Sequence, residues 1–439
     1  MSVHTHETGG LSGKDLLFAV LRHEKTAAVP WVPFAGVHAG KLKGYKGAEL
    51  LTDKTKLLES LLLVNELYDP DGQPVMFDLQ IEAEILGCKL LWADYAPPSV
   101  ASHPLADRLE VPTHLPRADE GRLPMVLEVM REMKAKVGHK TALYGLVTGP
   151  FTLASHLRGT DIFLDSMDHE DFLNELLAYC TRVCNLVADY YIDAGMDVIA
   201  VVDPLVSQVS PRHFKRFLAE PFTQVFAHLR ERGVFSSFFV CGDATKNIEV
   251  MCLTNPDSIS IDENINMAAA KEITDRYNIA IGGNIPLTTR MLLGNQQDNM
   301  KYVVDLLDQV SSHNLILSPG CDMPYDVPVE NTIGVMQAIR DPENTRVALA
   351  HYQAAEVDTS GVEIPDYANL KKPLVEVFTL DSETCAACMY MMGAANRMAD
   401  ELAGKVDLVE YKFTKKENVA RVVKMGVKNL PSLYINGEL

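Results

Sequence analysis

Two cysteines that each follow an apolar run of strand length are candidates for binding a metal ion. Cys241 lies in Phe238-Phe-Val-Cys-Gly-Asp243, and Cys321 lies in Ile316-Leu-Ser-Pro-Gly-Cys-Asp-Met-Pro-Tyr325. Cysteine thiolates are preferred ligands of Zn²⁺. We therefore expect the two side chains to meet and hold a zinc ion. The two cysteines are too far apart in the chain to form a local zinc motif, so their spacing gives no support for a metal. The alternative is that they are two packed thiols.

The segments around these cysteines alternate between apolar runs of strand length and longer runs of helical period. Repeated βα units of this kind close into a TIM barrel, whose reactive groups lie at the carboxyl ends of the strands. The predicted helices include 16–24, 53–67, 124–137, 171–194, 211–232, 267–277, 297–311 and 329–340. Eight strands are predicted: 32–35, 75–78, 142–148, 197–203, 234–241, 257–262, 279–284 and 314–318.

Polar residues stand at or just after the ends of these strands, where a barrel carries its site. They are His38, Asp78, Thr148, Asp203, Cys241, Asp262, Asn284 and Cys321. Asp78 and Asp203 are therefore candidates for moving a proton in a reaction, together with His156. The alternative for the aspartates is that they cap helices or are purely structural.

A second, smaller βα pattern follows the barrel. The expected division is a barrel over 1–345, a linker over 346–372 and a small domain over 373–439. Cys385 and Cys388 form a C-x-x-C motif after a predicted strand, and Pro431 stands in a Leu-Pro-Ser-Leu run. These features resemble the thioredoxin and glutaredoxin family, with Pro431 in the place of its cis-proline. A helix start lowers a thiol pKa, so Cys385 is the expected nucleophile and Cys388 the resolving thiol.

The C-x-x-C cysteines of this small domain have an alternative interpretation as half of a zinc ribbon. No second C-x-x-C is present to complete such a site. Asn436-Gly437 is a hairpin signal that should lead into a returning strand, so the thioredoxin-like domain is expected to be incomplete at the end of the chain.

Composition excludes several classes of protein. The net charge of −19 over 439 residues disfavours nucleic acid as a partner, since such binders need a concentrated basic surface. The first residues do not read as a signal peptide, and no run is apolar for long enough to span a membrane, so a cytoplasmic location is expected. The remaining cysteines among apolar neighbours are expected to be inert core residues: Cys88, Cys180, Cys184 and Cys252.

Several barrel motifs resemble the uroporphyrinogen decarboxylase superfamily over about residues 16–340. They are Tyr144-Gly-Leu-Val-Thr-Gly-Pro-Phe-Thr-Leu-Ala-Ser155, Asp193-Ala-Gly-Met-Asp-Val198, Gly282-Gly-Asn-Ile-Pro286 and Pro328-Val-Glu-Asn331. The resemblance implies either a decarboxylase or a zinc methyltransferase that works with a corrinoid. Asp78 matches the catalytic aspartate of the decarboxylases. Their two substrate-binding arginines are absent from Ala35-Gly-Val-His-Ala-Gly-Lys41, Cys321 replaces their last histidine, and His156 replaces their cleft tyrosine.

The methyltransferase branch is matched better. Ser318-Pro-Gly-Cys321 and Cys241-Gly242 resemble its zinc-binding motifs, which implies that both cysteines are zinc ligands. Phe239 departs from the pattern, because it stands where that branch has a histidine ligand. Catalytic zinc usually has three protein ligands. The predicted third ligand is Glu82, in an Ile-Glu-Ala-Glu run similar to that branch, followed by His156, with Asp203, Asp243 and His38 as further candidates. The alternatives are a solvated loop carboxylate for Glu82 and a satisfied cleft histidine for His156.

The resemblance therefore implies a zinc-dependent methyltransferase that moves a methyl group between a small donor or acceptor and a corrinoid. The chain has no Asp-x-His-x-x-Gly signature, so the cobalamin is expected on a partner protein. Expected small partners are a methylated substrate or a thiol or pterin acceptor, in anaerobic or redox-sensitive metabolism, and a homodimer is left open. The alternatives are a decarboxylase of a smaller substrate that uses Asp78, and a non-catalytic redox or scaffold protein.

Overall fold

The computed structural model describes residues 12–353, 358–382, 386–427 and 430–439. The chain divides into two compact units, Met1–His351 and Tyr352–Leu439. Cys241, Cys321 and the other predicted barrel residues lie in the first unit, and the C-x-x-C motif lies in the second.

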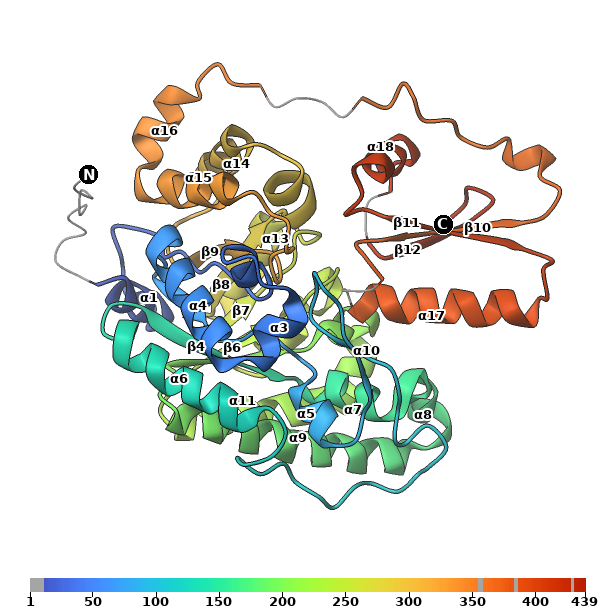
Figure 1. The fold of residues 1–439 in the computed structure, drawn as a ribbon, viewed down its shortest axis with the longest axis horizontal. Helices are drawn as coiled ribbons and strands as arrows, with labels where there is room; N and C mark the ends of the chain where they lie inside the picture. The colour runs from blue at the N-terminus through green and yellow to red at the C-terminus, as the bar shows by residue number, and fades with distance from the viewer. Residues whose placement is uncertain (1–11, 354–357, 383–385, 428–429) are drawn as a thin grey trace. The chain divides into compact units, whose positions relative to one another are not determined.

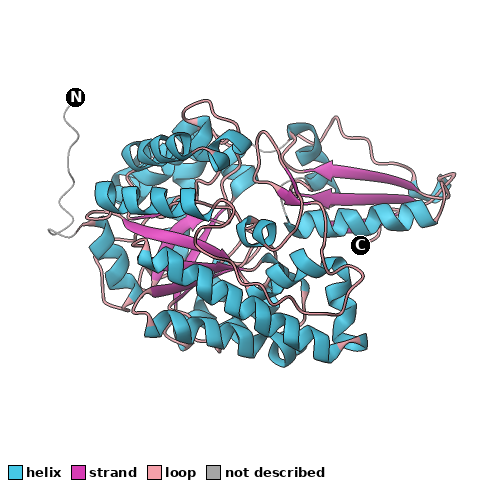
Figure 2. Cartoon of the chain, turned by 60° about the horizontal axis from the view of Figure 1, so that its bottom comes forward, coloured by secondary structure: helices cyan, strands magenta, loops and turns pink. Residues whose placement is uncertain are grey.

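A parallel sheet curled into a barrel forms the centre of the first unit, and helices surround it (Figures 1 and 2). Its strands follow the order β1-β4-β5-β6-β7-β8-β9, so the strands of this sheet pair in the order in which they occur along the chain. Their bounds are β1 Gly72–Pro74, β4 Ala142–Thr148, β5 Val198–Val202, β6 Phe235–Phe239, β7 Ser258–Ser260, β8 Ala280–Ile285 and β9 Leu315–Pro319.

The segment around Trp31 closes this sheet between its first and last strands. Trp31 forms a parallel bridge with Leu317 of β9, and the backbone N–H of Val32 donates to the Leu317 carbonyl over 2.9 Å. On the other side, the N–H of Asp71 donates to the Trp31 carbonyl over 2.9 Å. The predicted TIM-barrel fold, followed by a small α/β unit, is confirmed.

Two barrel strands differ from their predictions. Residues 32–35 were expected to form a strand, but only the preceding Trp31 forms an isolated bridge, to Leu317 of β9. We expected a strand over 75–78, but β1 ends at Pro74, and only the N–H of Val75 continues the ladder, to the Tyr144 carbonyl. Residues 75–77 are buried all the same. A buried apolar loop has the same pattern as a buried strand, which explains the error. A short hairpin of β2 (Leu90–Leu91) and β3 (Ser99–Val100) was not predicted.

The predicted barrel helices are present with boundaries shifted by a few residues. The run predicted as one helix over 211–232 contains a π-helical segment, η3, between α10 and α11. The helices are α1 Gly13–Leu21, α2 His38–Lys41, α3 Gly47–Thr52, α4 Lys54–Tyr68, α5 Ile81–Ile85, α6 Leu123–Val137, α7 Pro150–Arg158, η1 Gly159–Asp161, α8 Ile162–Asp168, α9 Glu170–Asp193, η2 Pro204–Gln208, α10 Pro211–His213, η3 Phe214–Leu218, α11 Ala219–Glu231, η4 Thr245–Asn247, α12 Ile248–Cys252, α13 Met267–Arg276, η5 Leu287–Leu292, α14 Gln296–Gln309, α15 Val329–Arg340 and α16 Pro342–Ala348.

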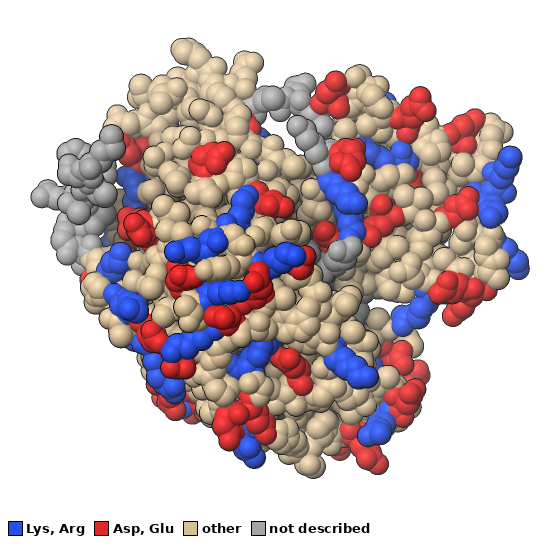
Figure 3. Space-filling model, viewed as in Figure 1, with Lys and Arg blue, Asp and Glu red and all other residues tan. Residues whose placement is uncertain are grey.

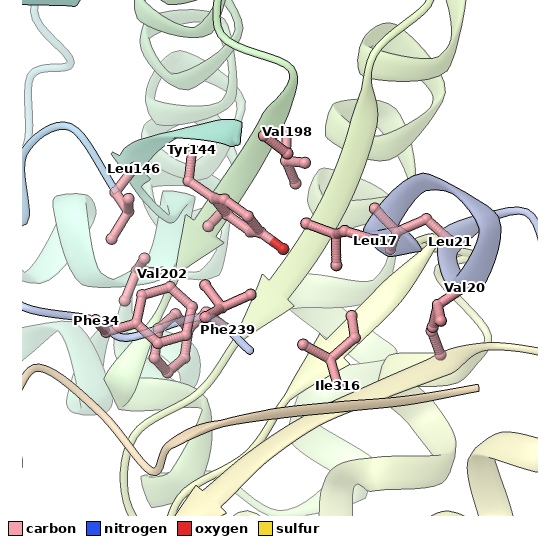
Figure 4. Close-up of a cluster of buried hydrophobic side chains, with 14 of the residues drawn as sticks. Leu17, Val20, Leu21, Phe34, Tyr144, Leu146, Val198, Val202, Phe239 and Ile316 are labelled. Atoms are coloured by element: carbon pink, nitrogen blue, oxygen red, sulfur yellow. The ribbon is translucent and has the colours of Figure 1, made fainter. Parts of the chain in front are cut away.

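Side chains fill the inside of the barrel, as Figure 4 shows. Helix α1 contributes Leu17, Val20 and Leu21 to this core, and its Phe18 ring packs on Phe235 at the start of β6. Helix α1 therefore covers the end of the barrel where the strands begin. The cysteines lie at the opposite end, so the barrel is closed at one end and carries its candidate site at the other.

The second unit contains a three-stranded sheet in the order β11-β10-β12. Strands β10 and β11 are parallel, β10 and β12 are antiparallel, and the Leu430–Pro431 peptide bond is cis, as expected for Pro431. A buried Glu376 accepts hydrogen bonds from Tyr367 and Arg421 beneath the sheet. The elements are η6 Tyr367–Asn369, β10 Leu374–Thr379, α17 Ala386–Glu401, β11 Asp407–Lys412, α18 Lys416–Met425 and β12 Ser432–Ile435.

Charged side chains of both signs alternate on the face of the first unit drawn in Figure 3. Lysines of the first unit pair with neighbouring carboxylates, as Lys46 does with Asp94 over 2.7 Å and Lys56 with Glu49 over 2.6 Å. Within the described residues, no helix combines the length and the apolar character that crossing a membrane requires.

Candidate functional site at the barrel mouth

Cys241 and Cys321 meet across the mouth of the barrel. Cys241 lies just beyond β6 and Cys321 just beyond β9, two strands whose places in the sheet are separated by β7 and β8. Their Cα atoms are 6.0 Å apart and their sulfur atoms are joined in a disulfide. Both residues are partly exposed. The predicted meeting of these two side chains is therefore present in the structure.

A glycine next to Cys241 holds it in place. Gly242 has a φ of +86°, which L side chains rarely adopt, and a Cβ there would lie 2.8 Å from Oγ of Ser207. The N–H of Gly242 donates to a carboxylate oxygen of Asp262 over 2.9 Å. Asp262, at the end of the neighbouring strand, thereby fixes the turn that presents Cys241.

Cys321 is held in a similar way from the other side. A Cβ on Gly320 would lie 2.6 Å from the backbone nitrogen of Glu263, so only glycine fits before the cysteine. Asp322 accepts a hydrogen bond from the N–H of Gly36 over 2.8 Å, and burial raises its pKa well above the usual range. The Pro-Gly-Cys-Asp sequence thus anchors the β9 loop to the loops that follow two other strands.

An aromatic floor lies beneath the cysteines. Phe239 is fully buried, with its ring 4.8 Å from that of Phe34 and 5.8 Å from that of Phe77, and both cysteines pack against the same core cluster. Phe34 and Phe239 lie beside each other in Figure 4. Phe239 is the last residue of β6, and Cys241 follows two residues later, beyond the end of the strand. Phe239 therefore places an apolar ring where a histidine would offer a nitrogen ligand.

Glu82 lies in α5 and is buried rather than solvated. One of its carboxylate oxygens accepts from the N–H of Thr148 and the other from the Thr148 hydroxyl, both over 3.0 Å. Burial raises the pKa of Glu82 to about 7. The alternative of a solvated loop carboxylate is wrong. Since each ionised carboxylate oxygen has a second lone pair, these bonds do not exhaust the acceptor capacity of Glu82.

The donor atoms of the site fit zinc only in part. The two thiols supply the sulfur ligands that Zn²⁺ favours and are brought together by the fold. Over the described ranges, however, no group of three or more His, Cys, Asp or Glu side chains is arranged to hold a metal ion. Glu82 therefore stays a predicted third zinc ligand beside Cys241 and Cys321. The candidate Asp243 instead accepts from the N–H and hydroxyl of Thr245 in its own loop.

Asp203 caps the helix that follows the neighbouring strand. It accepts hydrogen bonds from the N–H of Phe151 over 2.9 Å and from the N–H and hydroxyl of Thr152 over 3.2 and 2.6 Å, at the start of α7. Burial outweighs these bonds and raises the pKa of Asp203 to about 6. The side chain of Asp203 does not cap η2, the helix that follows it in the chain, and a catalytic role for Asp203 remains a prediction.

Asp78 forms an ion pair that the sequence analysis missed. Its carboxylate receives the Arg122 guanidinium over 2.5 Å, and the same guanidinium contacts Glu84 over 2.8 Å and lies over the Trp92 ring. Asp78 also accepts from the N–H of Gln80 over 2.8 Å. Arg122 is 44 residues away at the start of α6 and carries no local motif, so only the barrel fold brings it to Asp78.

The two candidate histidines differ in their partners. His38 is buried and bonded at both ring nitrogens, to the Tyr68 hydroxyl over 2.7 Å and to the Tyr325 carbonyl over 3.0 Å. His156 is equally buried, yet neither of its ring nitrogens has a hydrogen-bond partner among the described residues. Burial lowers the pKa of His156 to about 3. The satisfied-histidine interpretation therefore fits His38 and does not fit His156.

The predicted redox residues lie in the second unit. Cys385 falls outside the described residues. Cys388 is buried and its sulfur accepts from the N–H of Leu380 over 3.2 Å. Their redox roles stay predictions.

Comparison with known proteins now places the first unit. The profile of the family described as uroporphyrinogen decarboxylase (URO-D) matches residues 12–342, which is most of the chain. The chain belongs to the uroporphyrinogen decarboxylase family. The predicted family is thus confirmed. Because the match ends at residue 342, the thioredoxin-like character of the second unit stays a prediction.

Relatives from both branches of the uroporphyrinogen decarboxylase family are similar to this chain. The methylcobamide:CoM methyltransferase MtbA of Methanosarcina acetivorans is 25% identical over 326 residues, covering 72% of this chain and 94% of the relative. MtaA of Methanosarcina barkeri is 28% identical over 296 residues, covering 65% and 84%. A uroporphyrinogen decarboxylase of Wolbachia pipientis wMel is 24% identical over 312 residues, covering 67% and 88%.

A solved structure agrees with the methyltransferase side of this comparison. A methyltransferase from Methanosarcina mazei superposes with a TM-score of 0.70 at 25% identity, covering 76% of this chain and 99% of that chain. The barrel is therefore shared over its whole length with a protein of that description.

Proposed function

We propose that this chain is a corrinoid-dependent methyltransferase that transfers a methyl group between a corrinoid carried by a partner protein and a small thiol, with zinc bound by Cys241 and Cys321. The observation that carries the proposal is the convergence of these two partly exposed thiols at the mouth of a uroporphyrinogen-decarboxylase-family barrel. The relatives named methylcobamide:CoM methyltransferases support the corrinoid and a thiol acceptor such as CoM.

Three residues would hold the metal in this proposal: Cys241, Cys321 and Glu82. Zinc bound there would supply a Lewis acid that favours the thiolate form of an acceptor thiol. Thr148 would orient Glu82 through its N–H and hydroxyl, which is the kind of outer contact that fixes a metal-ligating carboxylate.

The aromatic floor contributes an apolar, water-poor surface beside the thiols. Phe34, Phe77 and Phe239 are buried and carry no polar atoms in their side chains. Because these rings are packed in the core, the floor supports the two cysteines from beneath and keeps water out of the barrel below them.

The other predicted site residues differ in their proposed roles. Burial raises the pKa of Asp203 to about 6, so this carboxyl is the candidate for exchanging a proton near neutral pH, whereas Asp78 is held in its ion pair with Arg122. His156 is neutral at that pH, because burial lowers its pKa to about 3. We propose that its unpartnered ring nitrogens orient a polar group of the substrate and that Asp78 orders the loop between β1 and α5.

Metal analysis tests the zinc site and separates this function from its alternatives. The protein should be purified under reducing conditions as wild type and as the Cys241→Ser, Cys321→Ser and Cys252→Ser variants. Stoichiometric zinc in the wild type and in Cys252→Ser, lost in the other two, supports the proposal, because Cys252 is a buried thiol outside the site. Absence of zinc from the reduced wild type would count against it and leave a decarboxylase or a scaffold.

A further inference from the structure

We propose that Cys241 and Cys321 form a redox-sensitive site, in which a low-molecular-weight disulfide converts the two thiols into a reversible intramolecular disulfide. The formation of this disulfide is independent of methyl transfer. Its consequence, that the oxidised pair cannot bind zinc, rests on the proposed function.

The backbone already holds the two residues at the separation that a disulfide needs. Disulfide-bonded cysteines usually have Cα atoms 4.4–6.8 Å apart, and here the distance is 6.0 Å, with the sulfur atoms bonded to each other. The turns that present them are fixed by Gly242 and Gly320, where added side chains would clash with their surroundings. The reduced and oxidised forms therefore need little backbone movement to interconvert.

Exposure should make this pair the preferred target of an oxidant among the described cysteines of the barrel. Cys241 and Cys321 are partly exposed, whereas Cys88, Cys180, Cys184 and Cys252 are buried. Burial also raises the pKa of the Cys88 and Cys252 thiols to about 12. Thiol–disulfide exchange requires an accessible thiolate. An oxidant arriving from solvent should therefore react at the barrel mouth and spare the core.

The ligand set explains why an oxidant could compete with a metal for these sulfur atoms. Phe239 gives the pair a carbon ring in place of a nitrogen ligand. The described residues assemble no group of three or more metal-binding side chains around it. Even with Glu82 as the proposed third ligand, the two thiolates would supply most of the protein donors, so the same two sulfur atoms that would bind the metal are the ones available for attack on a disulfide.

The exchange balances with a disulfide such as glutathione disulfide as the oxidant. One cysteine thiolate attacks a sulfur of glutathione disulfide, that S–S bond breaks, and one glutathione thiolate leaves. The second cysteine thiolate attacks the protein-bound sulfur of the mixed disulfide and expels the second glutathione. The protein loses two electrons and two thiol protons, glutathione disulfide gains the electrons, and dithiothreitol reverses the change.

Peptide mapping with zinc measurement on the same samples tests the proposal. The full-length, zinc-loaded protein should be incubated with glutathione disulfide or with dithiothreitol, quenched in acid, alkylated under denaturing conditions and digested. We expect a peptide pair linked through Cys241 and Cys321 only after oxidation, together with loss of bound zinc, and recovery of both free thiols with dithiothreitol. Cys252→Ser should behave like the wild type, and Cys321→Ser should leave glutathione on Cys241.

Each other outcome has a separate meaning. If the oxidised protein keeps its zinc and both cysteines are alkylated as free thiols, the redox proposal is overturned and the proposed function stands. Two separate glutathione adducts without a link would also overturn it. If the linked pair forms in protein that never bound zinc, the redox site is supported and the zinc part of the proposed function fails.

Discussion

Cys241 and Cys321 are 80 residues apart in the chain and follow strands that are not neighbours in the sheet, yet their Cα atoms lie 6.0 Å apart. The curvature of the barrel brings them together, because the loops beyond β6 and β9 turn inward over the same end of the barrel. A flat sheet of the same strand order would keep them apart. The candidate site therefore depends on barrel closure as much as on the two motifs.

Gly320 should be essential for presenting Cys321. A Gly320→Ala substitution places a Cβ 2.6 Å from the backbone nitrogen of Glu263, so the β9 loop must shift. We expect a loss of stability of about 1–3 kcal/mol, typical of overpacking, and reduced zinc binding. Urea denaturation and metal analysis measure both. Gly361→Ala, at a glycine with open space around it, is the matched control, and a Gly320→Ala protein with unchanged stability and zinc would refute this role.

The Asp78–Arg122 pair should contribute to stability as a unit. Arg122→Gln leaves the buried Asp78 carboxylate without its cation, which typically costs about 3–5 kcal/mol. Combining it with Asp78→Asn should restore part of the loss, so the double-mutant cycle should show coupling. Arg117→Gln, which removes a solvent-exposed pair with Asp119, should change stability by less than about 0.5 kcal/mol. Additive losses for the buried pair would show that the two residues act separately.

Acid should destabilise the barrel through its buried histidines. Burial lowers the pKa of His38 to about 4, below its value of 6.5 in the unfolded chain. As the pH falls below 6.5, the histidine of the unfolded chain takes up a proton that the folded protein does not bind until about pH 4. The free energy of unfolding therefore decreases as the pH falls from 6.5 toward 4. The loss between pH 7 and pH 5 is about 2 kcal/mol.

Unfolding measured at both pH values should therefore show a shallower pH dependence for His38→Asn than for the wild type. The exposed His351 provides the control, as His351→Asn should follow the wild type. His156 acts in the same direction, so some dependence should persist in the His38 variant. A His38→Asn protein as sensitive to acid as the wild type would contradict this assignment.

Local patterns predicted the barrel well because its strands are apolar throughout and its helices are amphipathic. The strand over Ala142–Thr148 and the helix over Val329–Arg340 are found with the predicted bounds. The strand predicted over 75–78 was misplaced, since a buried loop and a buried strand share one pattern. Pattern alone therefore identifies buried segments more reliably than their hydrogen bonding.

The site was only partly predictable for a related reason. Motif and strand-end position placed Cys241 and Cys321 together, but the charge partner of Asp78 is Arg122, which no local spacing connects to it. Likewise, the sequence left Asp203 as either a catalytic group or a helix cap, and it could not show that Asp203 bonds to the start of α7, where Thr152 lies 51 residues earlier in the chain. Contacts between distant segments depend on tertiary geometry, which a single sequence does not display.

Methyl transfer between a methylated corrinoid and a thiol is the reaction by which the proposed activity should be measured. The reduced, zinc-loaded protein should be mixed with methylcobalamin and CoM, and the visible spectrum of the corrinoid followed in anaerobic solution. The account predicts protein-dependent demethylation of methylcobalamin with formation of methylated CoM, retained in Cys252→Ser and lost in Cys241→Ser and Cys321→Ser. A methylcobalamin spectrum that stays unchanged with this and other small thiols, while zinc is bound stoichiometrically, would contradict it.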